Sequence, residues 1–285
     1  VAPLRFRHQA DLGDAALLKN VEELDHLAVG DLAITLEADY REYQLSQKAN
    51  VETYLDSALT AEQILEFGFS HICLATGSTW RRDGVSRQHV VPPLIDPGLT
   101  LLTPDDVMAG SVPFGRVVLW DDDHYYLGGV LAELLVQNGC DVTMVTTSQR
   151  VSDWTFNTLE HHAIHKRLAE IGVKIILNRG IAQIAADRVI SDCVFTGEEV
   201  EIEADAVVMV ASRVGDDVVF RDLKAREADW ADAGISSVRL IGDAEAPGPI
   251  AWATYAGHRY ARELEEPEIG DALPFRREVT ELAAV

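Results

Sequence analysis

Cysteine, positive charge and long apolar runs are all scarce in this sequence of 285 residues. Its 3 cysteines, Cys73, Cys140 and Cys193, are far apart, which argues against a disulfide framework and against an iron–sulfur cluster ligated by this chain alone. Only 24 Lys and Arg residues stand against 47 Asp and Glu, and the formal net charge of −23 repels nucleic acid and anionic membranes. No apolar run approaches the roughly 20 residues that span a bilayer. We therefore expect a soluble, cytoplasmic protein with no nucleic-acid or membrane partner.

Several signatures of catalysis and targeting are missing too. No G-x-S-x-G turn is present to hold a nucleophilic serine, and no close cysteine pair is present to shuttle electrons as in dithiol reductases. The chain opens VAPLRFRHQA, with neither an initiator Met nor a secretory pattern, so we expect it to be part of something longer. We predict no catalytic residue and no metal ligand within it.

The middle of the chain alternates between two hydrophobic periods. Strands are predicted at 117–120, 142–146 and 174–177, and helices at 129–138 and 158–171. Strands predicted at 188–191 and 199–203 could form a small antiparallel pair, and a strand at 206–210 is the last element of this lobe. Alternation with short connections predicts a parallel sheet covered by helices.

The flanking segments predict further α/β structure. The elements expected there are strands at 51–54, 71–75 and 238–241, a capped turn of helix within 103–110, and helices at 61–67 (capped by Thr60) and 250–264. We divide the chain into three segments, which are residues 1–112, 113–215 and 216–285.

The segment VVLWDDDHYYLGGVLAELL (117–135) has the form of a nucleotide-binding strand–turn–helix, but its turn carries Asp121, Asp122 and Asp123 in place of glycines. Glycines let a pyrophosphate approach the backbone and the helix N-terminus, whereas carboxylates repel phosphate and can stabilise that N-terminus themselves. The next strand ends at Thr146, with no acidic residue to hold a ribose. The lobe is therefore predicted to have an NAD-type fold that does not bind NAD(P).

Two metal-binding alternatives are weaker. Asp121 to His124 could offer hard oxygens to Mg²⁺ or Ca²⁺, but consecutive residues rarely point at one centre. His161 and His165 have the i, i+4 spacing of zinc ligands, but neither a catalytic Glu nor a third ligand accompanies them, which favours a solvated helix face.

A nucleotide site is suggested by two short motifs outside the middle lobe. Ala75, Thr76 and Gly77 follow one predicted strand, and Gly242 and Asp243 follow another. Flavoproteins with two dinucleotide-type domains place an A-T-G strand and a late G-D near their cofactor. Each motif alone is unspecific, since many strands end in glycine at a turn. We take these five residues as the candidate cofactor-binding set.

Together these features resemble the C-terminal half of the trimethylamine/dimethylamine/histamine dehydrogenase family, which is related to the 2,4-dienoyl-CoA reductases. The segments that carry the resemblance are 56–87, the Asp-filled 117–135, SDWTFNTLE (152–160), DAVVMVASR (205–213) and IGDAEAPGPIAWATYAGHRYARELEE (241–266). The resemblance covers most of the chain after about residue 39. The Asp-rich turn places it on the amine-dehydrogenase side, because the reductases keep glycines there for NADPH.

The resemblance implies a glutathione-reductase-like pair of dinucleotide-binding-type lobes with parallel sheets, the second lobe inserted in the first. It implies ADP or FAD in the first lobe, lined by Gly77, Gly242 and Asp243. It also implies FMN and a 4Fe–4S cluster in a barrel region or subunit not included here, an electron-transfer flavoprotein as acceptor, and a homo- or hetero-oligomer. The function implied is part of an FMN/iron–sulfur amine dehydrogenase or N-demethylase.

The chain departs from that family in two ways. The FMN barrel is absent from it, and so is the glycine-rich fingerprint that should open the first lobe. Two explanations stay open at this point: a fragment of a longer polypeptide, or a subunit whose partners supply the rest. A non-catalytic α/β module that uses its acidic surface to meet a basic partner is the alternative function.

Overall fold

The computed structural model describes residues 40–54 and 56–264. Contacts divide the described residues into two compact units. Unit 1 contains Ala58–Gly77 and the chain from Gly215 onward, and unit 2 contains Ser78–Val214 together with the described residues that precede Ala58. The chain therefore leaves unit 1 after Gly77 and returns to it at Gly215.

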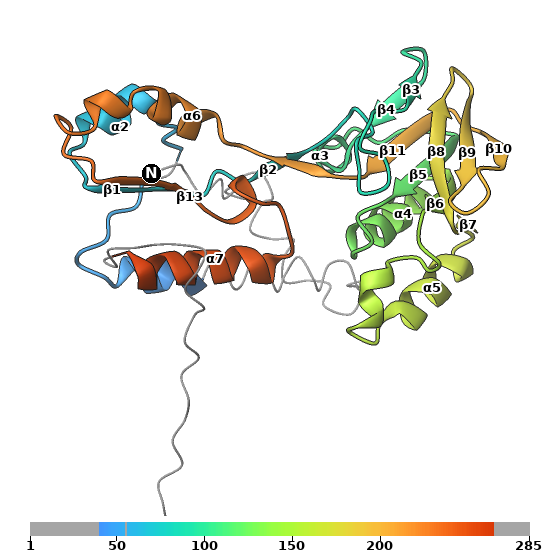
Figure 1. The fold of residues 1–285 in the computed structure, drawn as a ribbon. Coiled ribbons are helices and arrows are strands. Elements are labelled where there is room, and N and C mark those ends of the chain that lie inside the picture. Colours follow the sequence, from blue (N-terminus) through green and yellow to red (C-terminus); the bar gives the residue numbers. More distant parts are fainter. Residues whose placement is uncertain (1–39, 55, 265–285) are drawn as a thin grey trace, which may run out of the picture. The chain divides into compact units, whose positions relative to one another are not determined.

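Unit 2 is built on a five-stranded parallel sheet in the order β4-β11-β5-β6-β7 (Figure 1). Its strands are β4 (Thr100–Leu102), β5 (Arg116–Asp121), β6 (Asp141–Thr146), β7 (Lys174–Ile176) and β11 (Ala206–Val210). The central strands β5 and β11 are almost fully buried, as expected for strands covered on both faces. All five carboxyl ends therefore meet at one edge of the sheet.

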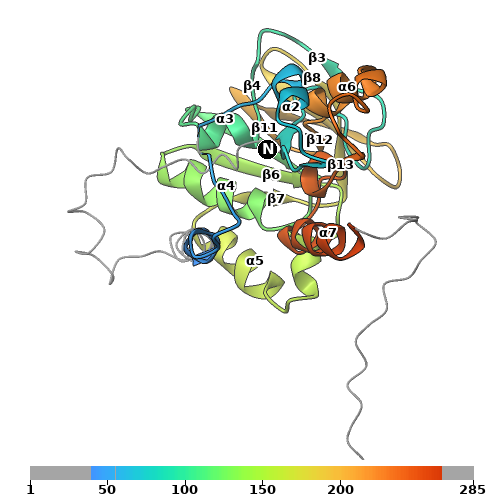
Figure 2. The ribbon, with the colours of Figure 1, turned by 90° about the vertical axis from the view of Figure 1, so that its left-hand side faces the viewer.

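One face of this sheet is covered by helices and the other by a second sheet (Figures 1 and 2). The helices are α3 (Pro104–Met108), α4 (Leu127–Gln137) and α5 (His161–Glu170). Leu131 and Leu135 of α4 and Leu168 of α5 pack against alternate residues of β5, β6 and β11 in one core cluster. Trp120 and Met209 point to the opposite face, where a second cluster includes Ile181 and Ile184. Period-2 alternation thus supplies both cores from the same strands.

The second sheet of unit 2 has the order β10-β9-β8-β3. It contains β3 (Leu94–Ile95), β8 (Arg179–Ile184), β9 (Arg188–Cys193) and β10 (Glu199–Glu203). The β8–β9 and β9–β10 pairs are antiparallel, and β3 runs parallel to β8. A further two-stranded ladder joins β2 (Ser78–Trp80) to β12 (Arg213–Gly215).

Unit 1 contains a two-stranded parallel sheet of β1 (His71–Leu74) and β13 (Ser237–Leu240). Its helices are α2 (Ala61–Glu66), α6 (Val218–Ala225) and α7 (Ile250–Glu263), with 3₁₀ turns η3 (Glu227–Asp229) and η4 (Gly242–Ala244). Ile64 of α2, Leu74 of β1 and Leu223 of α6 form a small core. Thr60 and Gln63 close a capping box at the start of α2, as the sequence predicted.

Most predicted elements are confirmed, and the exceptions have local causes. The strand predicted at 51–54 is wrong, because those residues form neither helix nor strand. The helix predicted from residue 158 begins only at His161, after the 3₁₀ turn η2 (Asp153–Phe156) and a left-handed Leu159. Five strands and one helix were not predicted because each is short, the strands having two to six residues and the helix eight: β2, β3, β4, β8, β12 and α6. No helix in 40–54 or 56–264 is long and apolar enough to cross a membrane.

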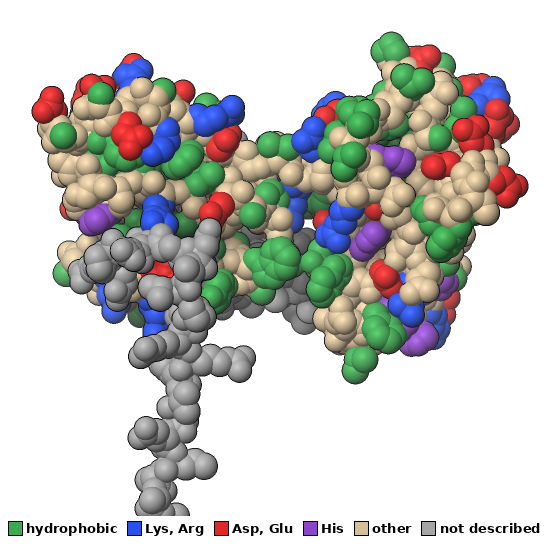
Figure 3. Space-filling view, in the orientation of Figure 1, with side chains coloured by type: hydrophobic (Ala, Val, Ile, Leu, Met, Phe, Trp, Pro, Cys, Tyr) green, Lys and Arg blue, Asp and Glu red, His purple; other side chains and the backbone are tan. Residues whose placement is uncertain are grey.

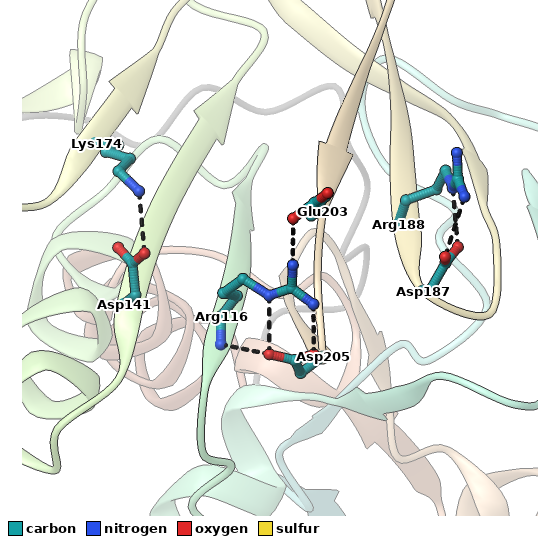
Figure 4. Close-up of polar contacts among 7 residues, drawn as sticks. All are labelled: Arg116, Asp141, Lys174, Asp187, Arg188, Glu203 and Asp205. Carbon is teal, nitrogen blue, oxygen red and sulfur yellow. Dashed lines mark hydrogen bonds and ion pairs between the residues drawn. The ribbon is translucent and has the colours of Figure 1, made fainter.

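Ion pairs brace the amino-terminal edge of the parallel sheet in unit 2 (Figure 4). Arg116, the first residue of β5, forms a bidentate ion pair with Asp205, which lies just before β11. The Arg116 backbone N–H also donates to Asp205, and its guanidinium contacts Glu203. Lys174 of β7 pairs with Asp141 of β6 at 3.0 Å. The charged edge of the sheet is therefore the one opposite to the Asp-filled turn.

Candidate functional site

The Asp-filled turn lies at the carboxyl edge of the parallel sheet in unit 2, where open α/β sheets bind their ligands. Asp121 ends β5, and the turn continues to Tyr126 before α4 begins at Leu127. The backbone N–H groups of Asp122 and Asp123 both donate to the carbonyl of Val210 in β11, at 2.9 and 3.1 Å. The turn is thereby tied to the neighbouring strand.

Asp122 is the centre of a buried hydrogen-bond network. Its carboxylate accepts hydrogen bonds from the Gln88 N–H at 2.9 Å and the Thr147 hydroxyl at 2.6 Å. Because the Thr147 hydroxyl hydrogen is donated to Asp122, the hydroxyl oxygen acts as the acceptor for Nε2–H of His124, at 3.1 Å. The same His124 nitrogen lies 3.3 Å from Asp122. Burial would raise the pKa of Asp122, but the donors around it outweigh burial and lower the pKa to about 2.

Asp121 sits in a different environment although it is the adjacent residue. Its side chain is fully buried, and its Oδ1 accepts one hydrogen bond, from the His124 N–H at 3.0 Å, whereas Oδ2 has no partner. A Cβ added to Gly128 would lie 2.7 Å from the carboxyl carbon of Asp121. The Asp121 carboxyl therefore fills the space beside the first turn of α4, where a dinucleotide turn keeps room for phosphate.

Aromatic and basic side chains surround the outer part of the turn. Tyr125 stacks on Trp154 with ring centroids 5.4 Å apart, and the guanidinium of Arg87 lies 5.8 Å from the Tyr125 ring. Asp123 is attracted by Arg213 and Arg87, but burial dominates and raises its pKa. Of the three aspartates, only Asp122 has a lowered pKa.

These carboxylates do not cap the N-terminus of α4. The first turn of α4 contains no acidic residue, and its N-cap, Tyr126, makes no side-chain capping bond. The aspartates lie before the cap: the Asp122 carboxylate is bonded to Gln88 and Thr147, and the Asp121 carboxyl packs against Gly128. They make the turn a packed structural element, and they leave no open glycine cradle for a pyrophosphate.

Neither metal-binding alternative gains support. Within 40–54 and 56–264, no group of three or more His, Cys, Asp or Glu side chains converges as a metal site would require. Asp121 and Asp122 point into separate hydrogen-bond environments. On α5, the ring of His161 contacts His162 and Phe156, with centroids 3.9 and 5.1 Å away.

The five residues predicted to bind a cofactor come together at one edge of unit 1. Because β1 and β13 are parallel, Ala75–Gly77 and Gly242–Asp243 both follow carboxyl ends of paired strands, and the Ile241 N–H donates to the Leu74 carbonyl. Gly77 and Gly242 have φ angles of +80° and +62°, which favour glycine. A Cβ on Gly77 would meet nothing within 4 Å, so ligand atoms can approach the backbone there.

Two of these side chains already have structural roles. The Thr76 hydroxyl donates to the carbonyl of Asp216, whose N–H returns a bond to the Gly77 carbonyl at 2.9 Å. Asp243 accepts a hydrogen bond from the Gly248 N–H at 3.1 Å, which holds the following turn. Gly215 was not predicted as a site residue, yet a Cβ there would lie 2.1 Å from the Ala244 carbonyl oxygen.

These residues fit an ADP or FAD group only in part. They offer a carboxylate and two left-handed glycines at a strand edge, which suits close backbone contact with a nucleotide. They do not include the G-x-G-x-x-G turn that would hold the pyrophosphate, and this motif is absent from the whole sequence.

A cavity of about 150 Å³ lies at the opposite side of unit 2, lined by Arg116, Asp187, Arg188, Glu201 and Glu203. Both arginines are ion-paired with carboxylates (Figure 4). Acidic side chains also gather on the surface over β9 and β10 (Figure 3). The cavity is therefore part of the charged edge and not of the candidate site.

Comparisons with known proteins agree on one family. A family described as the OYE-like second alpha/beta domain matches residues 102–208. Histamine dehydrogenase from Rhizobium sp. 4-9 shares 61% identity with a TM-score of 0.81, over 87% of this chain and 38% of that protein. The 6-hydroxypseudooxynicotine amine oxidase from Pseudomonas geniculata N1 shares 38% identity with a TM-score of 0.74, over 80% of this chain and 34% of that one.

Dimethylamine dehydrogenase from Hyphomicrobium sp. (strain x) is 34% identical in an alignment 267 positions long, and this alignment covers 84% of this chain and 36% of that protein. The chain thus spans little more than a third of the length of these relatives. The resemblance identified from the sequence is confirmed: this chain is a homologue of the dimethylamine/histamine dehydrogenase family.

Proposed function

We propose that this chain is the nucleotide-lobe portion or subunit of an FMN/iron–sulfur amine dehydrogenase or N-demethylase. The complete protein would oxidise a methylated or primary amine and pass the electrons to an electron-transfer flavoprotein rather than to NAD. Homology to the dimethylamine/histamine dehydrogenase family supports amine oxidation as the reaction.

The contact between Asp121 and Gly128 is the main support for the proposal that the electrons do not pass to NAD. The buried carboxyl lies against the first turn of α4, and Thr147, which follows β6, is committed to Asp122. A pyrophosphate at this edge would have to displace a packed side chain and accept repulsion from Asp122, whose pKa is lowered to about 2. The electrons must then leave by a route other than a nicotinamide bound in this lobe.

The substrate we favour is a primary amine of the histamine type. Identity is 61% to the histamine dehydrogenase and 34% to the dimethylamine dehydrogenase. This part of the argument rests on relatedness, because contacts to the substrate are expected in a barrel region outside this chain.

We assign the two units to a glutathione-reductase-like pair of lobes, the second inserted in the first. The exit of the chain from unit 1 after Gly77 and its return at Gly215 support an insertion. Unit 1 would hold ADP or FAD through Gly77, Gly242 and Asp243. FMN and a 4Fe–4S cluster would belong to the barrel region or partner subunit, where FMN supplies the two-electron acceptor for amine oxidation.

A homo- or hetero-oligomer and a docked electron acceptor complete the proposal. Tyr40 and Tyr43 are candidates for a docking face, since 53% and 62% of their surface is exposed. They lie in the helical turn at 40–46.

The test uses the native polypeptide that carries this sequence, purified from its source. We expect a denatured mass more than twice 31.3 kDa or a co-purifying FMN subunit, and reduction of an artificial dye by histamine or a methylated amine without NAD. A 31.3 kDa chain free of flavin would favour the non-catalytic module. Tight NADH binding that is lost on altering the Asp121 turn would overturn the proposal.

A further inference from the structure

Asp121 is the most completely enclosed acidic group that the structure describes. Its side chain is 0% exposed, and its Oδ2 has no hydrogen-bond partner. Its partners on the neighbouring strands are Thr146 of β6 and Val210 of β11, and its carboxyl packs against Gly128 of α4. None of these three residues carries a charge. An ionised carboxylate in such a place loses its hydration and receives a single hydrogen bond in return.

The charged groups near Asp121 do not compensate for that loss. Three charged groups act on Asp121 directly, and all lie on its own turn: Asp122, Asp123 and His124. Arg87, in the loop before β3, and Asp153, in the segment before α5, act on His124, and Arg213 acts on Asp123; Asp153 is itself paired with Arg150 at 2.9 Å. The first turn of α4 and the end of β6 add no charge. Two of the nearest charges are therefore carboxylates of the same sign.

His124 is the nearest cation, and its ring serves Asp122. Nε2 lies within 3.3 Å of Asp122 and 3.1 Å of Thr147, and only the backbone N–H of His124 reaches Asp121.

We propose that Asp121 carries a structural proton: the folded chain holds this carboxyl in its neutral form, and its ionisation releases the Asp121–His124 turn from the first turn of α4. The Asp-filled turn is then held closed by a proton on Asp121, and its three aspartates do not all carry negative charge. This inference does not depend on the amine dehydrogenase role, because it concerns only the packing of unit 2.

The sign of the pH effect follows from the direction of the shift. Burial raises the pKa of Asp121 from 3.8 to about 7, and the charges of Asp122 and Asp123 add to it against the attraction of His124. The closed turn therefore binds a proton that the open turn releases. The stabilisation that protonated Asp121 gives to the turn is complete below about pH 4, decreases as pH rises toward 7, and is lost above it.

Hydrogen exchange across 120–135 in the chain and in its Asp121→Asn variant tests the proposal. After correction for intrinsic rates, the opening equilibrium of this segment should increase by up to about tenfold per pH unit between pH 4 and 7 in the parent chain. The increase should be absent in Asp121→Asn, in which a neutral side chain of the same shape replaces the acid. The matched control, Asp141→Asn at the other end of β6, should retain it, since Asp141 is half-exposed and paired with Lys174.

A second measurement keeps the proposal testable if the Asn variant does not fold. In chain labelled with ¹³C at the aspartate carboxyl carbons, one resonance should titrate near neutral pH. Equal pH dependence in the parent and Asp121→Asn, or an NMR titration in which every aspartate ionises below pH 5, would overturn the proposal.

Discussion

Gly128 touches Asp121 so closely that a Cβ at position 128 would stand 2.7 Å from the carboxyl carbon and 3.1 Å from the Cβ of Asp121. The end of β5 and the start of α4 meet through this contact, with a carboxyl group on one side and bare backbone on the other. We expect Gly128→Ala to lower the free energy of unfolding by about 2 kcal/mol, because the buried Asp121 has no room to retreat.

The adjacent Gly129 provides the control. A Cβ there would meet Ile164 and Ser152 at 3.4 and 3.5 Å, which are ordinary contacts. Gly129→Ala should be neutral or gain up to about 1 kcal/mol from helix propensity. Denaturant unfolding of both variants makes the comparison, and equal effects would contradict the close packing of Asp121 on Gly128.

Asp122 should make the folded chain less stable in acid, whereas Asp121 should make it less stable as the pH rises. Its pKa is lowered to about 2 by its hydrogen-bond donors, so its contribution to stability is complete above about pH 4 and is lost as pH falls toward 2. We expect Asp122→Asn to cost about 2 kcal/mol at pH 7, because Gln88 N–H and Thr147 donate to different oxygens of Asp122 and an amide keeps only one acceptor oxygen, so its NH₂ group would face the other donor.

Unfolding measured between pH 2 and 7 tests this pH dependence. The parent chain should lose stability toward pH 2 more steeply than Asp122→Asn. Addition of a chelator should change neither curve, and a chelator-sensitive midpoint would instead favour the cation site.

Thr76 should contribute to stability through its hydroxyl, apart from any nucleotide. Its bond to the Asp216 carbonyl joins the end of β1 to the segment before α6. We expect Thr76→Val to lower the free energy of unfolding by about 1 kcal/mol, and Thr76→Ser, which keeps the hydroxyl, to have a smaller effect. Thermal unfolding without added nucleotide is the measurement, and an unchanged midpoint in Thr76→Val would contradict this role.

Leu159 should be a site of removable backbone strain. It has a φ angle of +65° and 84% of its surface is exposed, so a branched side chain adopts the left-handed region without burial in return. We expect Leu159→Asn to raise the free energy of unfolding by about 0.5 to 1 kcal/mol, because asparagine tolerates this conformation. Leu94, also exposed but in strand β3, is the control, and Leu94→Asn should bring no gain.

Local pattern was enough to predict most of unit 2. The strands β5, β6 and β11 are short apolar runs, and α4 and α5 follow at helical spacing, so strand–helix alternation predicted the parallel sheet. The same reasoning failed at 51–54, which has strand-like composition but no ladder partner among the described residues. Strand pairing is a tertiary event, so composition alone could not exclude it.

At the site, the sequence predicted which residues gather but not what each one does. Ala75–Gly77 and Gly242–Asp243 were grouped because flavoproteins with two dinucleotide-type domains place such motifs near their cofactor, and the parallel pairing of β1 and β13 brings them to one edge. The bond from Thr76 to Asp216 and the close approach of Gly215 to Ala244 join residues distant in the chain, so no local pattern could indicate them.

The family, the parallel α/β fold and the lack of phosphate-binding glycines in the turn at Asp121 could all be read from the chain, because they depend on residue types and their order. That three adjacent aspartates lie in three different environments became visible in the folded protein alone. Asp122 is ionised within a ring of donors, Asp123 faces two arginines, and Asp121 is enclosed with a single donor. The charge of a carboxyl depends on burial and on partners brought from β6, β11 and α4, and those distances exist only in the folded chain.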